Sequence, residues 1–353
     1  MSSRSLSQVN VRDADLLEEL ERQRTSPVFE VVVRQLEQKQ AKRDELAALP
    51  RDKWRRVTTA SALELAEPSK QDLRHIHSVL AICGLPYDRL PLGQRDFERK
   101  QGNMALDVAA GFLRDPNGEK TMQPVPFGPK ARLILMHLCS EAIRQKSPTI
   151  EIADTLTGFV RDMGFPKSGG KKGPLTAFKE QLNALAACTM RLTVWNGERV
   201  RTRSITPIDE MELWLPTHPD QRSLWPSTVT FSPAMYESLQ RHALPINTHV
   251  VRAFAGSARK LDLYFWLGYR IHNLEAPVTI SWEALKDQFG AGFKRDRDFR
   301  ANLARELNEI KETLRKLPVS VNENGLQITP ADPSVLALPQ VKPVKSSVTS
   351  KAS

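Results

Sequence analysis

PLTAFKEQLNALAACTMRLTVWNGERVRTR, residues 174–203, is the stretch that decides the fold of this chain. It opens on a proline, which suits the first turn of a helix. Apolar side chains then recur at helical spacing and form one stripe, made of Leu175, Phe178, Leu182 and Leu185. From Met190 the period changes to two, and Asn196-Gly197 is a strong hairpin signal because both turn positions need positive φ angles. The stretch therefore predicts a helix followed by a two-stranded hairpin.

The same order of elements extends upstream of this stretch and is repeated further along the chain. Upstream we expect a helix at Ala131–Gln145, a short strand at Thr149-Ile150 and a helix at Ile152–Met163. The repeat places a helix, a strand, a helix, a longer helix and a hairpin at Ala258–Asn273, Val278–Ile280, Ser281 to Phe289, Asp298–Leu317 and Val319–Thr329. This is the order of a winged helix, a helix-turn-helix followed by a β wing. The predicted fold class is α+β, predominantly helical, with two tandem winged-helix domains.

These elements divide the chain into four parts. Residues 1–89 are interpreted as a charged helical N-terminal extension, partly flexible and without a core of its own. Residues 90–244 are the first winged-helix domain with its connecting segment, and residues 245–332 are the second. Residues 333–353 form a Lys-, Ser- and Pro-containing tail that we expect to be disordered, because it has too few apolar side chains to pack.

The charge of the chain favours a polyanionic partner. Lys and Arg number 51 against 41 Asp and Glu, a formal net charge of +10. The basic excess gathers in a Lys/Gly loop before residue 174, in the return strand of the first hairpin and at the start of the second long helix. Arginine and asparagine can also make bidentate hydrogen bonds to guanine and adenine. We predict the DNA-binding residues to be Lys167, Lys171, Lys172, Thr176, Lys179, Asn183, Arg199, Arg201, Arg203, Lys294, Arg295, Arg297, Arg300 and Arg305.

Two acidic residues, Asp296 and Asp298, lie among the arginines of the second long helix. They either orient those arginines or cap the helix, since carboxylates at a helix N-terminus are favoured by the helix dipole. The sequence leaves both interpretations open.

The sequence offers no catalytic, metal or cofactor site. The Lys/Gly loop lacks P-loop spacing, because Phe165 stands where the first glycine is needed and Lys172 where Ser or Thr is needed. His75 and His77 have the His-apolar-His pattern of metal-dependent DNA-nicking enzymes, but we expect them on a helix, where residues two apart point in different directions. The three cysteines are expected to be small core residues. The prediction is a protein that is not an enzyme and holds no metal or cofactor.

The sequence also shows no apolar run long enough to span a bilayer and no apolar segment near its start. We therefore expect a cytoplasmic protein with no membrane partner.

Residues 250–273, VVRAFAGSARKLDLYFWLGYRIHN, resemble the helix that opens the second half of plasmid-encoded RepA-type replication initiators. The SARKLDLYFWLGYR core is the most specific part. PFGPKARLILMHLCSEAI and ARELNEIKETL fit the same pattern, so the likeness extends from about Leu90 to Pro330.

This resemblance implies a sequence-specific initiator with tandem winged helices. Such proteins bind direct repeats (iterons) in double-stranded plasmid origin DNA, promote origin opening and recruit host replication proteins, including the host initiator and the replicative helicase. They also exchange between monomers and dimers, which contributes to plasmid copy control. A winged-helix transcriptional regulator without initiator activity is the alternative function. A metal-dependent DNA-nicking enzyme is a more remote one.

Overall fold

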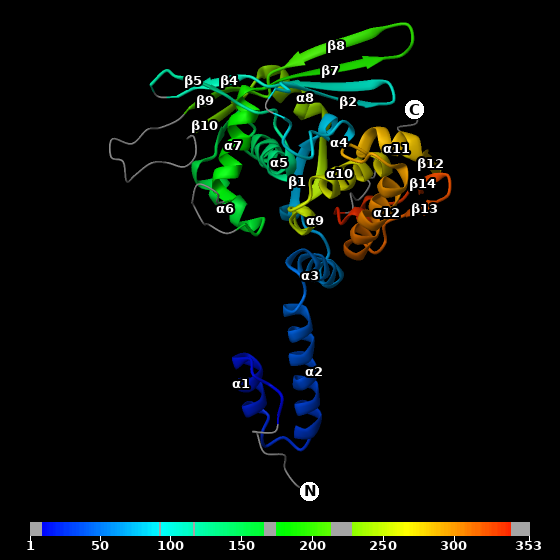
Figure 1. Ribbon diagram of the computed structural model, residues 1–353. Coiled ribbons are helices and arrows are strands. Elements are labelled where there is room, and N and C mark those ends of the chain that lie inside the picture. Colours follow the sequence, from blue (N-terminus) through cyan, green and yellow to red (C-terminus); the bar gives the residue numbers. More distant parts are fainter. Residues whose placement is uncertain (1–8, 92, 116, 166–173, 213–227, 340–353) are drawn as a thin grey trace, which may run out of the picture. The chain divides into compact units, whose positions relative to one another are not determined.

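The computed structural model describes residues 9–91, 93–115, 117–165, 174–212 and 228–339. The chain divides into two compact units, with the boundary after Thr58. Each unit is described by itself below, with element labels as in Figure 1.

The N-terminal unit is helical and has a small core. Its helices are α1 (Ala14–Arg22), α2 (Phe29–Ala47) and the first half of α3 (Arg51–Leu65). The core consists of five buried apolar residues, Val11, Leu16, Leu20, Val33 and Leu36. The expectation that this region has no core of its own is therefore wrong. Leucines four apart on α1 and apolar residues three apart on α2 each form one stripe, and the two stripes pack against each other.

Two buried helices lie at the centre of the larger unit. They are α5 (Gly128–Gln145) and α10 (Ala258–His272), which lie close together in Figure 1. Both are apolar over most of their surface, so they form the middle of a core that continues through the unit. The Arg132 guanidinium on α5 binds the Asp262 carboxylate on α10 through two hydrogen bonds of 2.6 and 2.7 Å.

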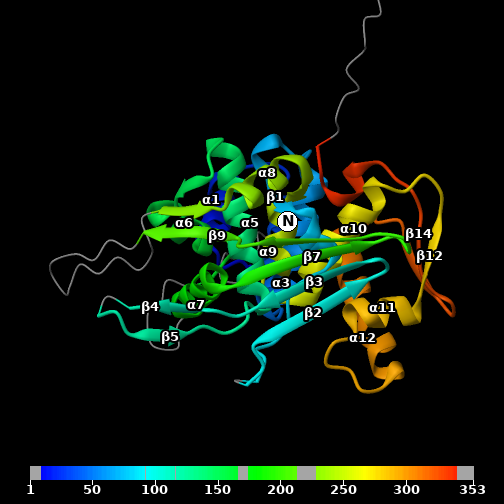
Figure 2. The same ribbon diagram turned by 90° about the horizontal axis from the view of Figure 1, so that it is seen from above.

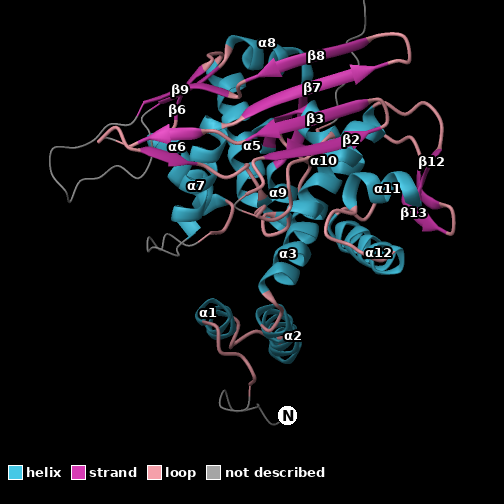
Figure 3. Ribbon diagram, turned by 45° about the horizontal axis from the view of Figure 1, so that its top comes forward, coloured by secondary structure: helices cyan, strands magenta, loops and turns pink. Residues whose placement is uncertain are grey.

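A four-stranded antiparallel sheet covers these helices, as Figure 3 shows. Its strand order is β2-β3-β7-β8, made of Asp96–Gln101, Met104–Ala109, Thr189–Trp195 and Val200–Ile205. The predicted hairpin forms its β7–β8 half. The predicted turn differs in detail, because Asn196 N–H donates to the Arg199 carbonyl and only Gly197 of the Asn-Gly pair has positive φ. The central turn residues are thus Gly197 and Glu198.

The remaining strands form four small sheets. The three-stranded sheets have the orders β6-β10-β9 and β12-β14-β13, and the two-stranded ones pair β1 with β11 and β4 with β5. In chain order these strands are β1 (Leu73–His77), β4 (Phe112–Arg114), β5 (Lys120–Met122), β6 (Thr149–Glu151), β9 (Ile208–Glu212), β10 (Thr228–Phe231), β11 (Ala243–Asn247), β12 (Val278–Ser281), β13 (Val319–Asn322) and β14 (Gly325–Ile328).

Other helices surround the core. They are α4 (Ser78–Ile82), α6 (Ala153–Asp162), α7 (Pro174–Ala187), α8 (Pro233–His242), α9 (Thr248–Phe254), α11 (Trp282–Phe289) and α12 (Asp296–Thr313), with 3-10 turns at Lys70–Asp72 and Pro333–Leu336. Figure 2 shows α7 and α12 both toward the lower edge of the view, on either side of β2 and β3. The mixed α+β class is therefore as expected, and every helix and strand predicted for the two copies is present in the predicted order.

The structure differs from the sequence-based expectations in the pairing of the first copy. Its short strand β6 pairs with β10, whereas the β7–β8 hairpin joins β3. In the second copy the short strand β12 pairs with β14 of the following hairpin. The two copies therefore share an element order but not a sheet topology, because β2 and β3 take the place beside the first hairpin that the short strand takes in the second copy.

Two predicted boundaries also fall inside ordered structure. The boundary between residues 244 and 245 lies within β11, which pairs with β1, and both belong to the larger unit. Leu336, Ala337 and Leu338 are buried in the core, so the predicted disordered tail does not begin at residue 333. Residues 340–353 of that tail lie outside the described part of the chain.

Candidate nucleic-acid interface

Helix α12 forms because one stripe of its side chains is apolar and its first turn is acidic. The stripe of Phe299, Leu303, Leu307 and Ile310 is buried, as predicted. Asp296 and Asp298 occupy the first turn, where the helix dipole favours carboxylates. Next to this buried stripe, α12 is also anchored to α10, because Lys260 binds Glu309 and Arg259 Nη1 lies 3.7 Å from Glu306 Oε1.

The start of α12 presents exposed basic side chains. Lys294, Arg295 and Arg297 are all exposed, and the side chain of Arg297 is 83% exposed. Asp298 Oδ2 accepts a hydrogen bond of 2.7 Å from Arg295 Nε, and its Oδ1 lies 3.6 Å from Arg297 Nε. Arg295 occupies the N-cap position without capping through its side chain. Asp298 thus hydrogen-bonds Arg295 and forms a longer ion pair with Arg297.

The second carboxylate of this turn, Asp296, binds Lys286 of α11. The Lys286 ammonium lowers the pKa of that carboxyl, because it stabilises the charged form. Asp296 therefore joins the start of α12 to the preceding helix.

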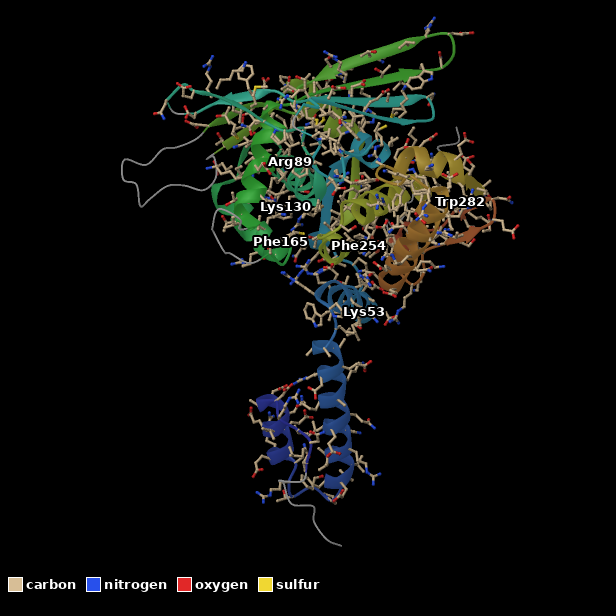
Figure 4. The ribbon with its side chains drawn as sticks, viewed as in Figure 1. Lys53, Arg89, Lys130, Phe165, Phe254 and Trp282 are labelled. Carbon is tan, nitrogen blue, oxygen red and sulfur yellow. The ribbon has the colours of Figure 1, made fainter. Side chains whose placement is uncertain are left out.

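One turn further along, Arg300 lies over the face of an aromatic ring. Its guanidinium carbon is 5.3 Å from the Trp282 ring centroid, a cation–π arrangement. Figure 4 labels Trp282 at the start of α11. Trp282 Nε1 donates a 3.2 Å hydrogen bond to the Asn322 carbonyl, which fixes the β13–β14 hairpin beside α11. Arg305 is also exposed, so five predicted residues, Lys294, Arg295, Arg297, Arg300 and Arg305, share one basic surface, here called the α12 surface.

The hairpin beside the α12 surface depends on a glycine. Gly325 has φ +143°, and a Cβ at this position would lie 1.9 Å from the Ile280 carbonyl oxygen of β12. The Asn322 side-chain oxygen accepts hydrogen bonds from the backbone N–H groups of Asn324 and Gly325. A glycine is therefore needed at residue 325 for a close backbone approach as well as for the turn geometry.

Helix α7 is a second, less exposed candidate. Its predicted apolar stripe is buried, and Thr176 on the predicted DNA face is exposed. Lys179 and Asn183 are half-buried. Glu180, on the same face, binds Arg89. The predicted loop residues Lys167, Lys171 and Lys172 lie outside the described residues.

The arginines of β8, Arg201 and Arg203, lie on the inner face of the four-stranded sheet. The register pairs Arg203 with Leu192 and Arg201 with Val194, so these arginines share the inner face of the sheet with apolar side chains. Arg203 Nη2 lies 3.9 Å from Glu237 Oε2 of α8. Arg199 lies in the turn before β8 and is exposed. The structure thus distributes the predicted site residues over α12, α7 and β8 rather than gathering them on one element.

Sequence reasoning missed the side chains that act on these arginines. Trp282 of α11 contacts Arg300, Lys286 of α11 binds Asp296 beside the arginines, and Arg241 of α8 lies with Arg203 at the hollow below β8. These residues reach the site only through tertiary packing, so their spacing in the sequence gave no signal.

His75 and His77 lie on strand β1, so the expectation of a helix there is wrong. His77 Nδ1 accepts a hydrogen bond from the Val79 amide, and Nε2 lies 2.9 Å from Ser238 Oγ. Burial lowers the pKa of His77 to about 4. Both ring nitrogens of His77 therefore have hydrogen-bond partners within the fold.

The three cysteines are free and buried, as expected for core residues. In the described part of the chain, no three His, Cys, Asp or Glu side chains gather as a metal site would require. Among the described helices none has both the length and the apolar character needed to cross a bilayer.

Comparison with known proteins gives one family. Residues 125–284 match the family described as plasmid-encoded RepA protein, a shorter range than Leu90 to Pro330. No curated protein matches the chain significantly. Two crystal structures of domains 2 and 3 of RctB are similar at 11% identity. The first has a TM-score of 0.44, and the match covers 71% of this chain and 96% of the RctB chain. The second has a TM-score of 0.45, and the match covers 74% of this chain and 100% of the RctB chain. A likeness at this level defines neither fold nor function. Residues 125–284, which run from just before α5 into α11, are thus similar to the plasmid-encoded RepA family that the sequence resembles.

Proposed function

We propose that this protein initiates plasmid replication by binding repeated sequences in double-stranded origin DNA. The observation that carries the proposal is the basic first turn of α12, where Asp298 hydrogen-bonds Arg295 and Arg297 stays highly exposed. The family match over residues 125–284 supports a plasmid replication initiator. The α12 surface, which lies beyond that match, supports DNA as its ligand.

In this proposal each copy of the repeated element order acts as a winged helix and reads part of one repeat. The first turn of α12 enters the major groove, where Arg297 is free to make a bidentate contact with guanine. Arg300 and Arg305, further along the same exposed side, contact the phosphates. The β13–β14 hairpin, fixed to α11 through Trp282, lies along the backbone as the wing.

The proposal includes the later steps of initiation. The bound protein promotes opening of the origin, recruits the host initiator and replicative helicase, and exchanges between monomer and dimer. None of these steps requires chemistry by the protein itself, so we propose no catalytic residue.

The test is binding of the full chain to its cognate origin fragment and to a scrambled duplex of equal length, measured across a range of salt concentrations. We expect a specificity ratio of about 10³ or more. Arg297→Ala should lower specific binding by about 1–3 kcal/mol and leave nonspecific binding nearly unchanged. Lys316→Ala is the matched control, because it removes one exposed positive charge beyond the other end of α12. Equal affinity for both duplexes, or equal effects of the two variants, would contradict the proposal.

A minimal replicon assay separates initiation from regulation. A plasmid that carries only the origin and the gene for this protein should replicate, and the Arg297→Ala variant should reduce its copy number. Specific DNA binding without replication would identify a transcriptional regulator instead.

A further inference from the structure

A hollow of about 440 Å³ lies beneath the outer strand of the four-stranded sheet. It runs between the inner face of β7 and β8 and helix α8, and helices α4 and α5 close its far side. We call it the β8 groove. It is separate from the α12 surface, which is formed by other elements.

The floor of the β8 groove is apolar. Leu192 and Val194 of β7, Met104 of β3 and Ile205 of β8 line it and are only half-buried. These side chains alternate with polar ones that point to the other face of the sheet, so the apolar set is the one directed at the core. Apolar surface is left uncovered here, in a place where the rest of the sheet is packed.

The rim of the β8 groove is basic. Arg201, Arg203, Arg241 and His242 line it. Among the described residues that line the groove none is acidic. The nearest carboxylate belongs to Glu237, which lies 2.6 Å from Arg241 and 3.9 Å from Arg203. Three arginines line the rim and Glu237 pairs with two of them, so the rim has an excess of positive charge.

The strand that borders the groove has a free edge. β8 ends the sheet order, and its only described partner is β7. Asn196 N–H binds the Arg199 carbonyl, so the alternation of an antiparallel ladder directs the backbone groups of Arg201 and Arg203 toward β7. The same alternation directs the N–H and C=O groups of Val200, Thr202 and Ser204 outward. The side chains of these three residues are exposed.

We propose that the β8 groove binds an extended acidic segment of a partner protein, which adds to β8 as a fifth strand. Its backbone pairs with the free edge of β8. Its carboxylates pair across the strands with Arg201 and Arg203, and a bulky apolar side chain on the same face enters the groove above Leu192 and Val194.

This occupant uses all three features of the site, and the competing occupants do not. DNA phosphates would pair with the arginines but would leave the apolar floor and the strand edge without partners. A second copy of β8 would bring its own Arg201 and Arg203 against the same residues, and like charges across a strand pair are destabilising. An acidic polypeptide meets the charge, the floor and the edge together.

The test uses a short fluorescein-labelled synthetic peptide in which glutamate, leucine and glutamate occupy every second position and threonine stands between them, so that the acidic and apolar side chains share one face of the strand. The peptide is titrated with the full chain and followed by fluorescence anisotropy. The double variant Arg201→Ala/Arg203→Ala should weaken binding by about tenfold or more. Arg191→Ala, on the outer face of the neighbouring strand, is the matched control and should change binding by no more than about twofold. A peptide with lysine in place of glutamate should not bind.

Two further measurements test strand addition itself. Hydrogen exchange at Val200, Thr202 and Ser204 should slow when the peptide binds. Thr202→Pro removes one outward N–H without breaking a bond to β7, so it should abolish peptide binding and leave the fold intact. Absence of saturable binding, or saturation without protection of these amides, overturns the proposal. So does loss of origin-DNA binding by the double variant without any effect on the peptide, because the arginines then serve DNA as the sequence predicts.

Discussion

Replacing Asp262 with asparagine tests how the two central helices are joined. The Arg132 and Asp262 side chains are 3% and 4% exposed. Arg132 also donates to the carbonyls of Leu85, Pro86 and Gly128, at 2.6, 3.0 and 2.9 Å. All of its partners are therefore inside the protein, and Asp262→Asn removes the only negative charge among them.

The expected loss of stability follows from this burial. A charge that loses its partner inside a protein costs about 3–5 kcal/mol, since it keeps its desolvation penalty and loses the compensating attraction. Asp262→Asn should therefore lower the free energy of unfolding of the larger unit by about 3–5 kcal/mol. At about 2–4 °C per kcal/mol, the Tm should fall by roughly 6–20 °C.

The assay is urea and thermal unfolding followed by far-ultraviolet circular dichroism. The control is Glu237→Gln, which removes the acidic partner of Arg241 in an exposed pair with the same N–O distance of 2.6 Å. Exposed pairs contribute about 0.2–1 kcal/mol, so the control should change little. In Arg132→Met/Asp262→Asn neither charge remains buried alone, so the double variant should cost about 1–3 kcal/mol less than the sum of the single variants. Equal effects of Asp262→Asn and the control would refute the reasoning.

Three other predictions concern the rest of the fold. Burial lowers the pKa of His77 to about 4, below about 6.5 in the unfolded chain, so the unfolded state binds more protons between these values and stability falls as the pH drops from 6.5 to 4. His77→Asn should reduce the dependence of the unfolding free energy on pH in this range by up to about 1.4 kcal/mol per pH unit, measured from urea midpoints at several pH values. An unchanged pH dependence would show that His77 does not cause the loss of stability. Gly325→Ala should lower the free energy of unfolding in urea by about 3 kcal/mol or more, because its Cβ would meet a carbonyl oxygen. Gly102→Ala, at φ +54° in open space, should lower it by about 1 kcal/mol. Similar losses in the two variants would contradict the clash. Burial raises the pKa of all three thiols to about 12, so Ellman's reagent should react with them only after unfolding, and rapid reaction of the native protein would show otherwise.

The helices of the larger unit were predictable because their signals are local. Stripes at helical spacing mark α7 and α12. Ser281, with which the predicted helix begins, caps α11 by accepting a hydrogen bond from the Ala284 amide at 3.2 Å. The hairpins β7–β8 and β13–β14 also follow from short-range alternation. These features need only residues a few positions apart.

The strands before α5 were not predictable in the same way. In β2, DFERKQ, the buried position is occupied by Arg99, which hides the alternation of apolar and polar residues. Arg99 is accommodated there because it lies over the rings of Tyr87 and Phe97 and donates to the Gln288 carbonyl. Two of these partners, Tyr87 and Gln288, come from outside the strand through the fold, so the sequence of the strand alone does not indicate its pairing with β3.

In the candidate site, too, local features were predictable from the sequence and features that depend on tertiary contacts were not. The basic start of α12 is contiguous in sequence, and the structure shows the predicted arginines exposed there. The direction of the β8 arginines depends on β3, β7 and α8, which are brought together by the fold. Their alternation predicts that they share one face, but it does not predict that this face is the apolar one.

The pairing of β1 with β11 has a consequence for synthesis of the chain. The only described strand that pairs with residues 73–77 is residues 243–247. This pairing therefore cannot form until the whole intervening segment has been translated. At about 5–20 residues per second the delay is on the order of ten seconds or more, long compared with the microseconds in which a hairpin closes. A nascent chain ending near residue 240 already contains α5 but still exposes the edge of β1. During that interval, β1 is the segment that a ribosome-bound chaperone would protect.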